Sequence, residues 1–414
     1  MRRLTLTEYI TATGVALDAV ELAMLRRVYP TLRIEPAMGL PGRFDLTPDQ
    51  HIGLVQLPSV AIEIQPKTPM SSVVFLVSYA ADRVNWSRIQ TAWQDDATLV
   101  DLIATVLCRS IERATRKGLL AGYRSHEESL SAPRGRIRFP EHISKRLGQA
   151  PPIEIEHDLF TTDILENRVL LSALSQLRHL PLRSTTITRE IGRAARLFGG
   201  VELFHYPKHN IPEPAITQLN RHYEPSLRIA QLVLRSSSVD AGAGARRADA
   251  FLVDMNAVFE MFLRTALRES LGCSLSAFPD RPPRLRLDVA ERIPLKPDLC
   301  LIANGAISWV GDAKYKRLSP AGYQNADVYQ MLAYLTATGL SSGTLIYAAV
   351  AGLASTTHVI DGATREVRVR TLDLQKPPLG ILRDVASIAK EIQASATVPE
   401  ISDHPKGSAV SATR

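Results

Sequence analysis

The chain has 414 residues, with 49 Lys or Arg and 42 Asp or Glu, so its formal net charge is +7. Its 45% share of hydrophobic residues excludes wholesale disorder, and its longest apolar runs fall short of the roughly 20 residues that a membrane helix needs. Three cysteines without paired spacing argue against a disulfide framework, and we expect a cytoplasmic protein of two or three domains.

Residues 1–95 are predicted to form a β-rich N-terminal domain. Apolar residues alternate with other residues from Val60 to Ile64, which is the pattern of a half-buried strand. Residues 52–56 precede this strand and predict another, because a Pro-Ser turn separates the two. The apolar run from Val73 to Val77 predicts a further strand.

Residues 96–240 are predicted to be mainly helical. Apolar residues at helical spacing predict a helix over residues 99–111, with Asp95 and Asp96 as its N-terminal caps. The other predicted features of this region are helices at residues 164–180 and 226–234 and a Ser/Gly/Ala-rich linker at residues 236–244.

Residues 245–393 are predicted to form an α/β domain, which makes the chain an α/β (α+β) multidomain protein. Its expected elements are a long helix at 248–271, short strands, a helix at 321–338, further strands and a final helix at 379–394. This order predicts a mixed sheet flanked by helices. Residues 394–414 are rich in Ser, Ala, Pro and Thr and are predicted to be a disordered tail.

Two short apolar strands around an Asn304-Gly305 turn form a predicted β-hairpin in the last domain. An acid lies at the far end of each strand: Asp298, after a proline, in the first and Asp312 in the second. Lys314 follows two residues after Asp312, so these two side chains are expected on the same face of their strand.

Two carboxylates and a lysine are groups that metal-assisted phosphodiester hydrolysis uses. Asp298 and Asp312 are predicted to bind a hard divalent cation, with Mg²⁺ as the first candidate. The metal would polarise the phosphate and help a water to ionise. Lys314 is predicted to orient or deprotonate this water, or to stabilise the extra negative charge. The alternative is an exposed Asp-Lys ion pair at the end of a strand.

The register of the hairpin tests this prediction. With a two-residue Asn304-Gly305 turn and regular pairing, Asp298 and Asp312 would lie on opposite faces of the sheet. The metal site therefore predicts either a three-residue loop, which would pair Asp298 with Val310, or a β-bulge.

The helices on either side of the hairpin supply three more candidate site residues. Glu260 is predicted to share an apolar helix face with Leu252 and Leu263, where an acid needs a partner such as a metal-bound water. We therefore count it with the metal site. Gln330 and Tyr334 lie four residues apart on one face of the following helix and could bind a DNA phosphate or steady the lysine. The alternative for Glu260 is a glutamate at the boundary of the apolar face, and the alternative for the other two is a helix with ordinary interfacial polar residues.

Pro297-Asp298, Asp312-Ala-Lys314 and Gln330-x-x-x-Tyr334 together resemble the PD-(D/E)xK nucleases, and more closely their RecB-like branch. The wider chain is similar to the McrC subunit family of modification-dependent (5-methylcytosine-type) restriction systems. The blocks that carry this resemblance follow one another in order: Ile52-Gly-Leu-Val, Ile62-Glu-Ile-Gln-Pro-Lys67, Gly135-Arg-Ile137, Glu166-Asn-Arg-Val-Leu170, Met255-Asn-Ala-Val-Phe-Glu260, Lys296-Pro-Asp298 and Asp312-Ala-Lys-Tyr-Lys316.

The resemblance implies a Mg²⁺-dependent DNA endonuclease subunit that acts against foreign DNA. It implies that Asp298 and Asp312 bind the metal and that Lys314 is catalytic. It also implies a separate AAA+ GTPase partner, which reads the modified base and whose hydrolysis this subunit stimulates. The sequence contains no GxxxxGK[ST] phosphate loop of its own, which agrees with that division of labour. Residues 1–95 are expected to dock on the partner.

Two other functions stay open. A stand-alone RecB-like repair nuclease would cut DNA without a partner, whereas a non-catalytic adaptor would activate a nucleoside-triphosphatase partner and leave its acids unused. A further motif has two interpretations: Arg134, Arg136 and Arg138 at alternate positions either contact DNA phosphates or bond to acids at a domain interface.

Overall fold

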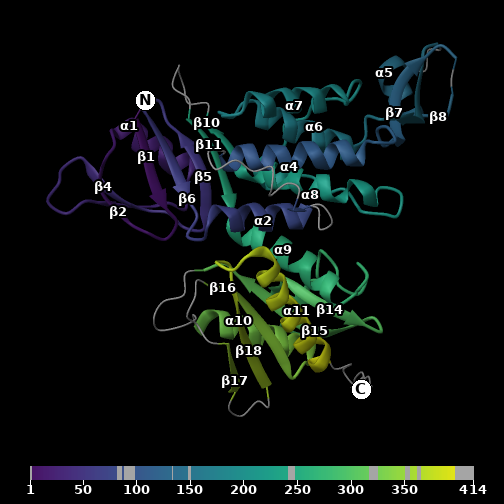
Figure 1. Cartoon of the computed structure of the whole chain (residues 1–414). Helices are drawn as coiled ribbons and strands as arrows, with labels where there is room; N and C mark the ends of the chain where they lie inside the picture. Colours follow the sequence, from purple (N-terminus) through teal and green to yellow (C-terminus); the bar gives the residue numbers. More distant parts are fainter. Residues whose placement is uncertain are drawn as a thin grey trace, which may run out of the picture. The chain divides into compact units, whose positions relative to one another are not determined.

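The computed structural model has the predicted mixed α/β architecture, with several sheets and interspersed helices (Figure 1). It divides into two compact units, Met1–Lys67 with Val77–Asp254, and Thr68–Leu76 with Met255–Arg414. The assignment of residues 1–95 to partner docking stays a prediction. The residues that the structure describes are 2–81, 86–87, 98–132, 134–147, 151–240, 248–316, 325–349, 355–360 and 365–396.

The first unit contains a five-stranded sheet that joins residues from both ends of the unit. In spatial order its strands are β1 (Arg2–Thr7), β6 (Val60–Gln65), β5 (His51–Gln56), β11 (Ala248–Asp254) and β10 (Ser237–Asp240). β1 is parallel to β6, and the other neighbours are antiparallel. Helix α1 (Ala19–Val28) contributes Met24, Leu25 and Val28 to the core cluster of this sheet. The strands predicted at residues 52–56 and 60–64 are confirmed.

A smaller sheet and a set of helices complete the body of this unit. The sheet has the order β2 (Ala12–Ala16), β4 (Arg43–Thr47) and β3 (Arg33–Pro36), and the helices are α4 (Leu99–Ala114), α6 (Leu165–Arg178), α7 (Thr185–Arg196) and α8 (Glu224–Ser236), with the 3-10 turns η1 (Lys208–Asn210) and η2 (Arg221–Tyr223). The helices predicted at residues 99–111, 164–180 and 226–234 are confirmed. Thr98 caps α4, in a capping box with Asp101. The predicted caps Asp95 and Asp96 lie outside the described residues.

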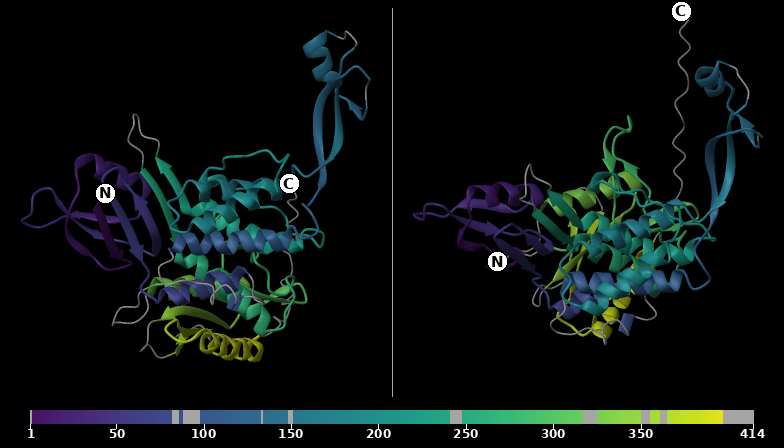
Figure 2. Two further views of the ribbon diagram at one scale, coloured as in Figure 1. Left: turned by 45° about the horizontal axis from the view of Figure 1, so that its top comes forward. Right: turned by 90° about the horizontal axis from the view of Figure 1, so that it is seen from above.

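A narrow arm projects from the helices of the first unit (Figures 1 and 2). Its two long antiparallel strands are β7 (Gly122–Leu130) and β9 (Ile153–Thr161), and its far end carries β8 (Arg136–Ile137) and α5 (Phe139–Arg146). Arg134 donates to Glu128 at 2.9 Å, and Arg138 is bonded to Glu127 and Glu141. Arg134 and Arg138 are therefore bonded to acids, as the second interpretation expected, and these acids belong to the arm itself.

The second unit is built on a mixed five-stranded sheet. In spatial order its strands are β14 (Leu299–Ala303), β15 (Ala306–Lys314), β16 (Ser342–Ala349), β18 (Arg365–Asp373) and β17 (Thr356–Ile360). β15, β16 and β18 are parallel, whereas both edge strands are antiparallel to their neighbours. The other elements are α9 (Met255–Ser270), α10 (Asn325–Thr338), α11 (Pro378–Ser395) and the two-strand ribbon β12 (Leu285–Arg286) with β13 (Pro294–Leu295).

Helices α9, α10 and α11 all pack against this sheet. Helix α10 buries Met331, Tyr334 and Leu335 in one core cluster with sheet residues such as Val310 and Leu345. Helices α9 and α11 pack against each other and against β15 and β18 respectively. The predicted final helix is confirmed, and it extends to Ser395; residues 397–414 of the predicted tail lie outside the described part of the chain.

Two predicted elements are wrong, for one physical reason. The run Val73–Val77 is not a strand but part of helix α2 (Met70–Ala81), and residues 248–254 are not the start of a helix but strand β11. Every side chain from Val73 to Val77 is fully buried, and β11 lies inside its sheet. A run that is buried on all sides shows no period, so its pattern does not separate strand from helix.

The remaining predicted segments lie partly outside the description. Helix α8 ends at Ser236, where the linker was expected to begin, and β10 then takes up residues 237–240. The rest of that linker, residues 241–244, is outside the described residues. Among the helices that the structure describes, none combines the length and the hydropathy that a membrane crossing requires.

Candidate active site

The hairpin of β14 and β15 contains the irregularity that the metal hypothesis requires. Its turn is the two-residue Asn304-Gly305, with φ of 52° and 80°, and it pairs Ala303 with Ala306. Ile302 pairs with Ile307, but Leu301 pairs with Trp309, so Ser308 is an extra residue in β15. The predicted three-residue loop is wrong, and the predicted bulge is confirmed.

The bulge changes which residues face each other at the far end of the hairpin. Beyond Ser308 the register sets Leu299 opposite Gly311. Extended by one residue, the same register sets Asp298 opposite Asp312. Directly opposed residues share a face of the sheet, so the bulge brings the two acids together.

Both acids lie in a poorly solvated place. Burial raises the pKa of Asp312 to about 7, and the negative charge of Asp298 adds to the rise. Burial raises the pKa of Asp298 to about 7 as well, with the charge of Glu260 as the next cause. The backbone amide of Ala313 donates to Asp298 Oδ2 at 3.0 Å. The site thus concentrates negative charge that water does not screen.

Lys314 provides the nearest positive charge. Its Nζ lies 2.5 Å from Asp312 Oδ2 and donates to Gln330 Oε1 at 2.7 Å. The contact with Asp312 is a close ion pair with a buried carboxylate oxygen, and it favours the charged form of both groups. Burial lowers the pKa of Lys314, but the carboxylates of Asp312, Asp327 and Asp298 outweigh burial and raise it overall. In this state Lys314 is a cation at neutral pH.

Helix α10 places Gln330 and Tyr334 beside this pair. Gln330 Nε2 donates to the Tyr334 hydroxyl at 2.9 Å, and that hydroxyl donates to the Lys296 carbonyl at 2.9 Å. The same hydroxyl oxygen lies 3.4 Å from Asp312 Oδ1. Burial raises the pKa of Tyr334, so the phenol keeps its proton. The two residues connect Lys314 to the backbone that leads into Asp298.

Glu260 reaches the site from helix α9. Its Oε2 accepts from Arg264 at 2.7 Å, and Arg264 Nε donates to the Asp298 carbonyl at 3.0 Å. A hydrogen bond between the Glu260 and Asp298 side chains contributes to the raised pKa of Asp298. Glu260 therefore lies next to Asp298, with which the sequence analysis grouped it, while its role at a metal stays a prediction. Its predicted neighbour Leu252 is instead on β11, so the predicted common face was partly wrong.

Three residues that the sequence analysis did not assign lie behind the lysine. Asp327 is 3% exposed and contacts Lys316 Nζ at 2.8 Å and Lys314 Nζ at 3.6 Å. The Tyr347 hydroxyl donates to Asp327 at 2.7 Å. Lys316 carried a usable signal, because it continues the two-residue spacing of Asp312 and Lys314 along one strand face. Tyr347 lies on β16 and had no local signal.

The acids match the chemistry of a divalent cation, although no cage is preformed. In the part of the chain that the structure describes, no three His, Cys, Asp or Glu side chains form a group that could hold a metal ion. Asp298 and Asp312 nevertheless offer the carboxylate oxygens that a hard cation prefers, and a cation would offset the repulsion that raises their pKa values. The buried Asp312 Oδ2, which lies against the ammonium group of Lys314, fits the same use.

Comparison with known proteins assigns the chain to a family. A family model described as "McrBC 5-methylcytosine restriction system component" matches residues 46–348. The type IV methyl-directed restriction enzyme EcoKMcrBC of Escherichia coli (strain K12) is 22% identical over 341 residues, which cover 75% of this chain and 92% of that protein.

Two solved structures from Thermococcus gammatolerans are also similar in part. The refined half-complex from a tetradecameric assembly of McrB AAA+ hexamers with bound McrC has a chain that matches with a TM-score of 0.48 and 15% identity, over 93% of this chain and 100% of that one. A chain of the McrBC complex solved by cryo-EM matches with a TM-score of 0.41 and 16% identity, over 65% and 88%. Since the family model spans more than half of the sequence, the chain belongs to the McrBC 5-methylcytosine restriction system component family.

Proposed function

We propose that this chain is the nuclease subunit of its restriction system and hydrolyses DNA phosphodiester bonds with Mg²⁺. One observation carries the proposal. Because of a bulge of one residue, the strand register, extended by one position, sets Asp298 opposite Asp312 at the poorly solvated end of the hairpin, and the ammonium group of Lys314 lies 2.5 Å from Asp312. An ion pair on the surface of a strand would need neither the burial nor the second acid.

The residues divide the chemistry among them. Asp298 and Asp312 would hold Mg²⁺, which when bound supplies a Lewis acid for the phosphate and lowers the pKa of a water. Glu260, next to Asp298, is placed to accept a hydrogen bond from that water. Among the three roles predicted for Lys314, the structure favours stabilisation of negative charge, because the surrounding carboxylates raise its pKa and keep it protonated. Gln330 would fix the direction of the ammonium group.

The substrate and the partner follow from the family. The E. coli relative is a methyl-directed restriction enzyme, so we propose modified, foreign DNA as the substrate. The resemblance to the McrC subunits implies a separate McrB-like AAA+ GTPase that this chain joins and stimulates. The sequence has no phosphate loop with which to replace that partner.

A cleavage assay tests the proposal. The chain would be combined with a McrB-like AAA+ GTPase, GTP, Mg²⁺ and methylated plasmid DNA. Asp312→Ala should abolish cleavage but keep the stimulation of GTP hydrolysis. Asp384→Ala is a matched control, because Asp384 lies on α11 in an ion pair with Lys376. It should cut like the wild type.

The same assay separates the two alternatives. Cleavage by the chain alone, without GTP or partner, would support a stand-alone repair nuclease. If Asp312→Ala and Lys314→Ala both kept full restriction of foreign DNA in cells, the chain would be an adaptor and the assignment of the site would be wrong.

A further inference from the structure

The segment Glu166-Asn167-Arg168 has no place in the nuclease, yet each of its side chains contacts a different part of the first unit. It lies in the first turn of α6, directly after the arm returns to the helices. Glu166 accepts from Asn220 at 2.9 Å and so holds the loop before α8. Asn167 and Arg168 hold the two chain segments at the base of the arm.

Asn167 joins the entry and the exit of the arm. Its side chain is fully buried, and Nδ2 donates to the Leu120 carbonyl at 2.8 Å and to the Thr162 carbonyl at 2.6 Å. Leu120 precedes β7, and Thr162 follows β9. The amide of Leu120 also donates to the hydroxyl of the buried Tyr223 at 2.8 Å. One amide group therefore ties both strands to the same turn of α6.

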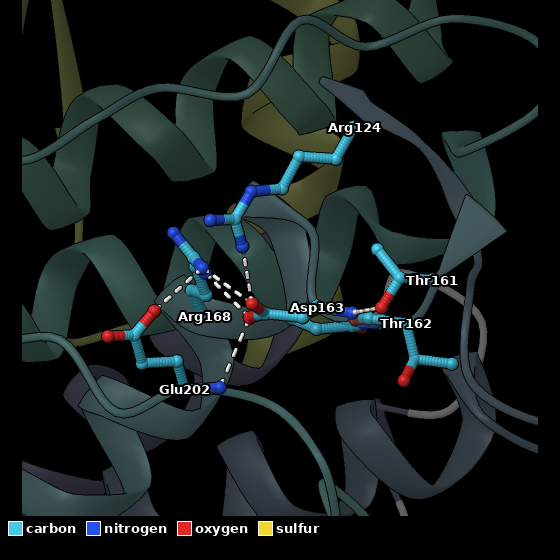
Figure 3. A network of polar contacts seen from close by, with 7 residues as sticks. Arg124, Thr161, Thr162, Asp163, Arg168 and Glu202 are labelled. Carbon is cyan, nitrogen blue, oxygen red and sulfur yellow. Dashed lines mark hydrogen bonds and ion pairs between the residues drawn. The ribbon is translucent and has the colours of Figure 1, made fainter. Parts of the chain in front are cut away.

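Arg168 makes the second connection, through Asp163 (Figure 3). Its Nε donates to Asp163 Oδ1 at 2.7 Å and its Nη2 to Oδ2 at 2.5 Å, which is the two-point geometry of a strong guanidinium–carboxylate pair. Arg124 of β7 donates to the same Oδ2 at 2.5 Å. Asp163 thus links α6 to the strand that leaves the helices as well as to the one that returns.

Glu202 and Phe204 complete this network around Arg168. Arg168 Nη2 lies 2.9 Å from Glu202, whose backbone amide donates to Asp163 at 3.1 Å (Figure 3). The guanidinium of Arg168 stacks on the ring of Phe204, 4.3 Å from its centroid. The Arg168 side chain is 14% exposed and that of Asp163 is 16% exposed, so this pair is largely shielded from water, whereas Glu202 and Arg124 at the edge of the network are 60% and 43% exposed. Hydrogen bonds from Arg168 are the main reason that the pKa of Asp163 is lowered to about 2.

A two-stranded ribbon does not by itself fix the angle at which it leaves the helices, because no contact along its length sets that angle. Here both strands are attached to one helix by a buried amide and by a multiply bonded ion pair. We propose that Asn167, Arg168 and Asp163 are positioning residues that form a clamp, which fixes the direction of the arm relative to α6. The arm and the helices of the first unit then move as one body. This inference does not depend on the proposed nuclease activity.

The competing explanation is that the network only stabilises the fold of the unit. That explanation predicts that its loss lowers the melting temperature and weakens α6 and α8 themselves. A clamp predicts a local effect, in which the arm gains angular freedom while the helices stay protected from hydrogen exchange.

The experiment uses the full chain with spin labels at Ser144→Cys in α5 and Thr185→Cys in α7, both exposed positions, after Cys273→Ser. Double electron–electron resonance gives the distance distribution between the two labels. The parent should give one narrow peak, and Arg168→Ala should broaden it about twofold or more. Arg168→Lys keeps the charge but loses the two-point geometry, so it should give an intermediate width.

Hydrogen exchange on the same proteins supplies the second readout. In Arg168→Ala the amides of residues 120–124 and 161–163 should exchange about tenfold faster, with α8 unchanged. Arg228→Ala is the matched control, because Arg228 is similarly covered but pairs with Glu224 inside α8. An unchanged narrow distance peak in a folded Arg168→Ala protein would overturn the clamp. So would an equal loss of protection throughout α6 and α8, which would make the network merely structural.

Discussion

Replacement of Asp312 by an asparagine should make the metal-free protein more stable at neutral and alkaline pH. Burial, with the charge of Asp298, raises the pKa of Asp312 from an ordinary 3.8 to about 7. The folded state therefore binds this proton more tightly than the unfolded chain. As the pH rises from about 4 to about 7, the unfolded state ionises first and stability is lost. The amide side chain of the variant would carry no such cost because it does not ionise.

The pKa change sets the size of the effect. A rise of about three pKa units corresponds to about 4 kcal/mol at pH 8, at about 1.4 kcal/mol per unit. Asp298 shares the same repulsion, and Lys314 loses a partner in the variant, so we expect about half of this, or about 2 kcal/mol. For a unit of this size that gain corresponds to a rise in Tm of about 4–8 °C.

Thermal melts in EDTA at several pH values provide the assay. The difference in Tm between Asp312→Asn and the wild type should be small near pH 4, grow up to about pH 7 and stay constant above it. Mg²⁺ at pH 8 should raise the Tm of the wild type and narrow the difference. Asp384→Asn, outside the site, should show no such gain. A lower Tm for Asp312→Asn at pH 8, or a difference that does not change with pH, would refute the reasoning.

Three further changes test packing and chemistry separately. Gly311→Ala should cost about 2 kcal/mol in urea unfolding, because its Cβ would overlap the Trp309 ring. Gly192→Ala in α7 should gain about 0.5–1 kcal/mol, because its Cβ would meet only Arg196 Nη1 at an ordinary contact distance of 3.9 Å. Equal effects of the two substitutions would contradict this packing. Lys314→Met should reduce the cleavage rate about 10²–10³-fold. Calorimetry on this variant should show Mg²⁺ binding at least as tight as in the wild type. Loss of Mg²⁺ binding would instead mean that the lysine has a structural role. Tyr334→Phe removes the hydrogen bond to the Lys296 carbonyl and should lower the free energy of unfolding by about 1 kcal/mol. Its loss of cleavage activity should be smaller than that of Lys314→Met. An equal loss of activity would mean that the phenol takes part in the reaction.

The sequence predicted those elements whose side chains divide between core and solvent. The helical spacing in residues 164–180 and 379–394 has one buried and one exposed side. The strand from Val60 to Ile64 was predicted from its alternation, although Ala61 is buried and Glu63 is only partly exposed. The runs at 73–77 and 248–254 have no exposed side, so their conformation is decided by tertiary packing. No local pattern shows that residues 122–161 form an arm, because its direction depends on contacts with α6.

The candidate site follows the same division. The motif around Asp298, Asp312 and Lys314 is local to one hairpin and was readable from the sequence. The bond from Lys314 to Gln330 matches one of the two roles that the sequence analysis gave to Gln330. The contact of Lys314 with Asp327 joins a strand to a later helix and was not assigned from the sequence, so only the tertiary structure reveals it. The clamp at Asn167 and Arg168 is of this kind as well, since its partners lie before and after the whole arm.

The bulge at Ser308 was only partly predictable from the sequence. It explains how the hairpin can combine a favourable two-residue turn with two acids on the same face. A two-residue turn with Asn304 and Gly305 matches the twist of the strands, because both residues accept a positive φ. That turn alone would set the two acids on opposite faces. The chain keeps the favourable turn and brings the two acids back to one face by the extra residue in β15, where the Ser308 hydroxyl donates to the Leu301 carbonyl at 3.3 Å. The sequence required an irregularity but did not show its place. The reason is that a bulge costs little wherever its polar groups find partners, and those partners belong to the neighbouring strand.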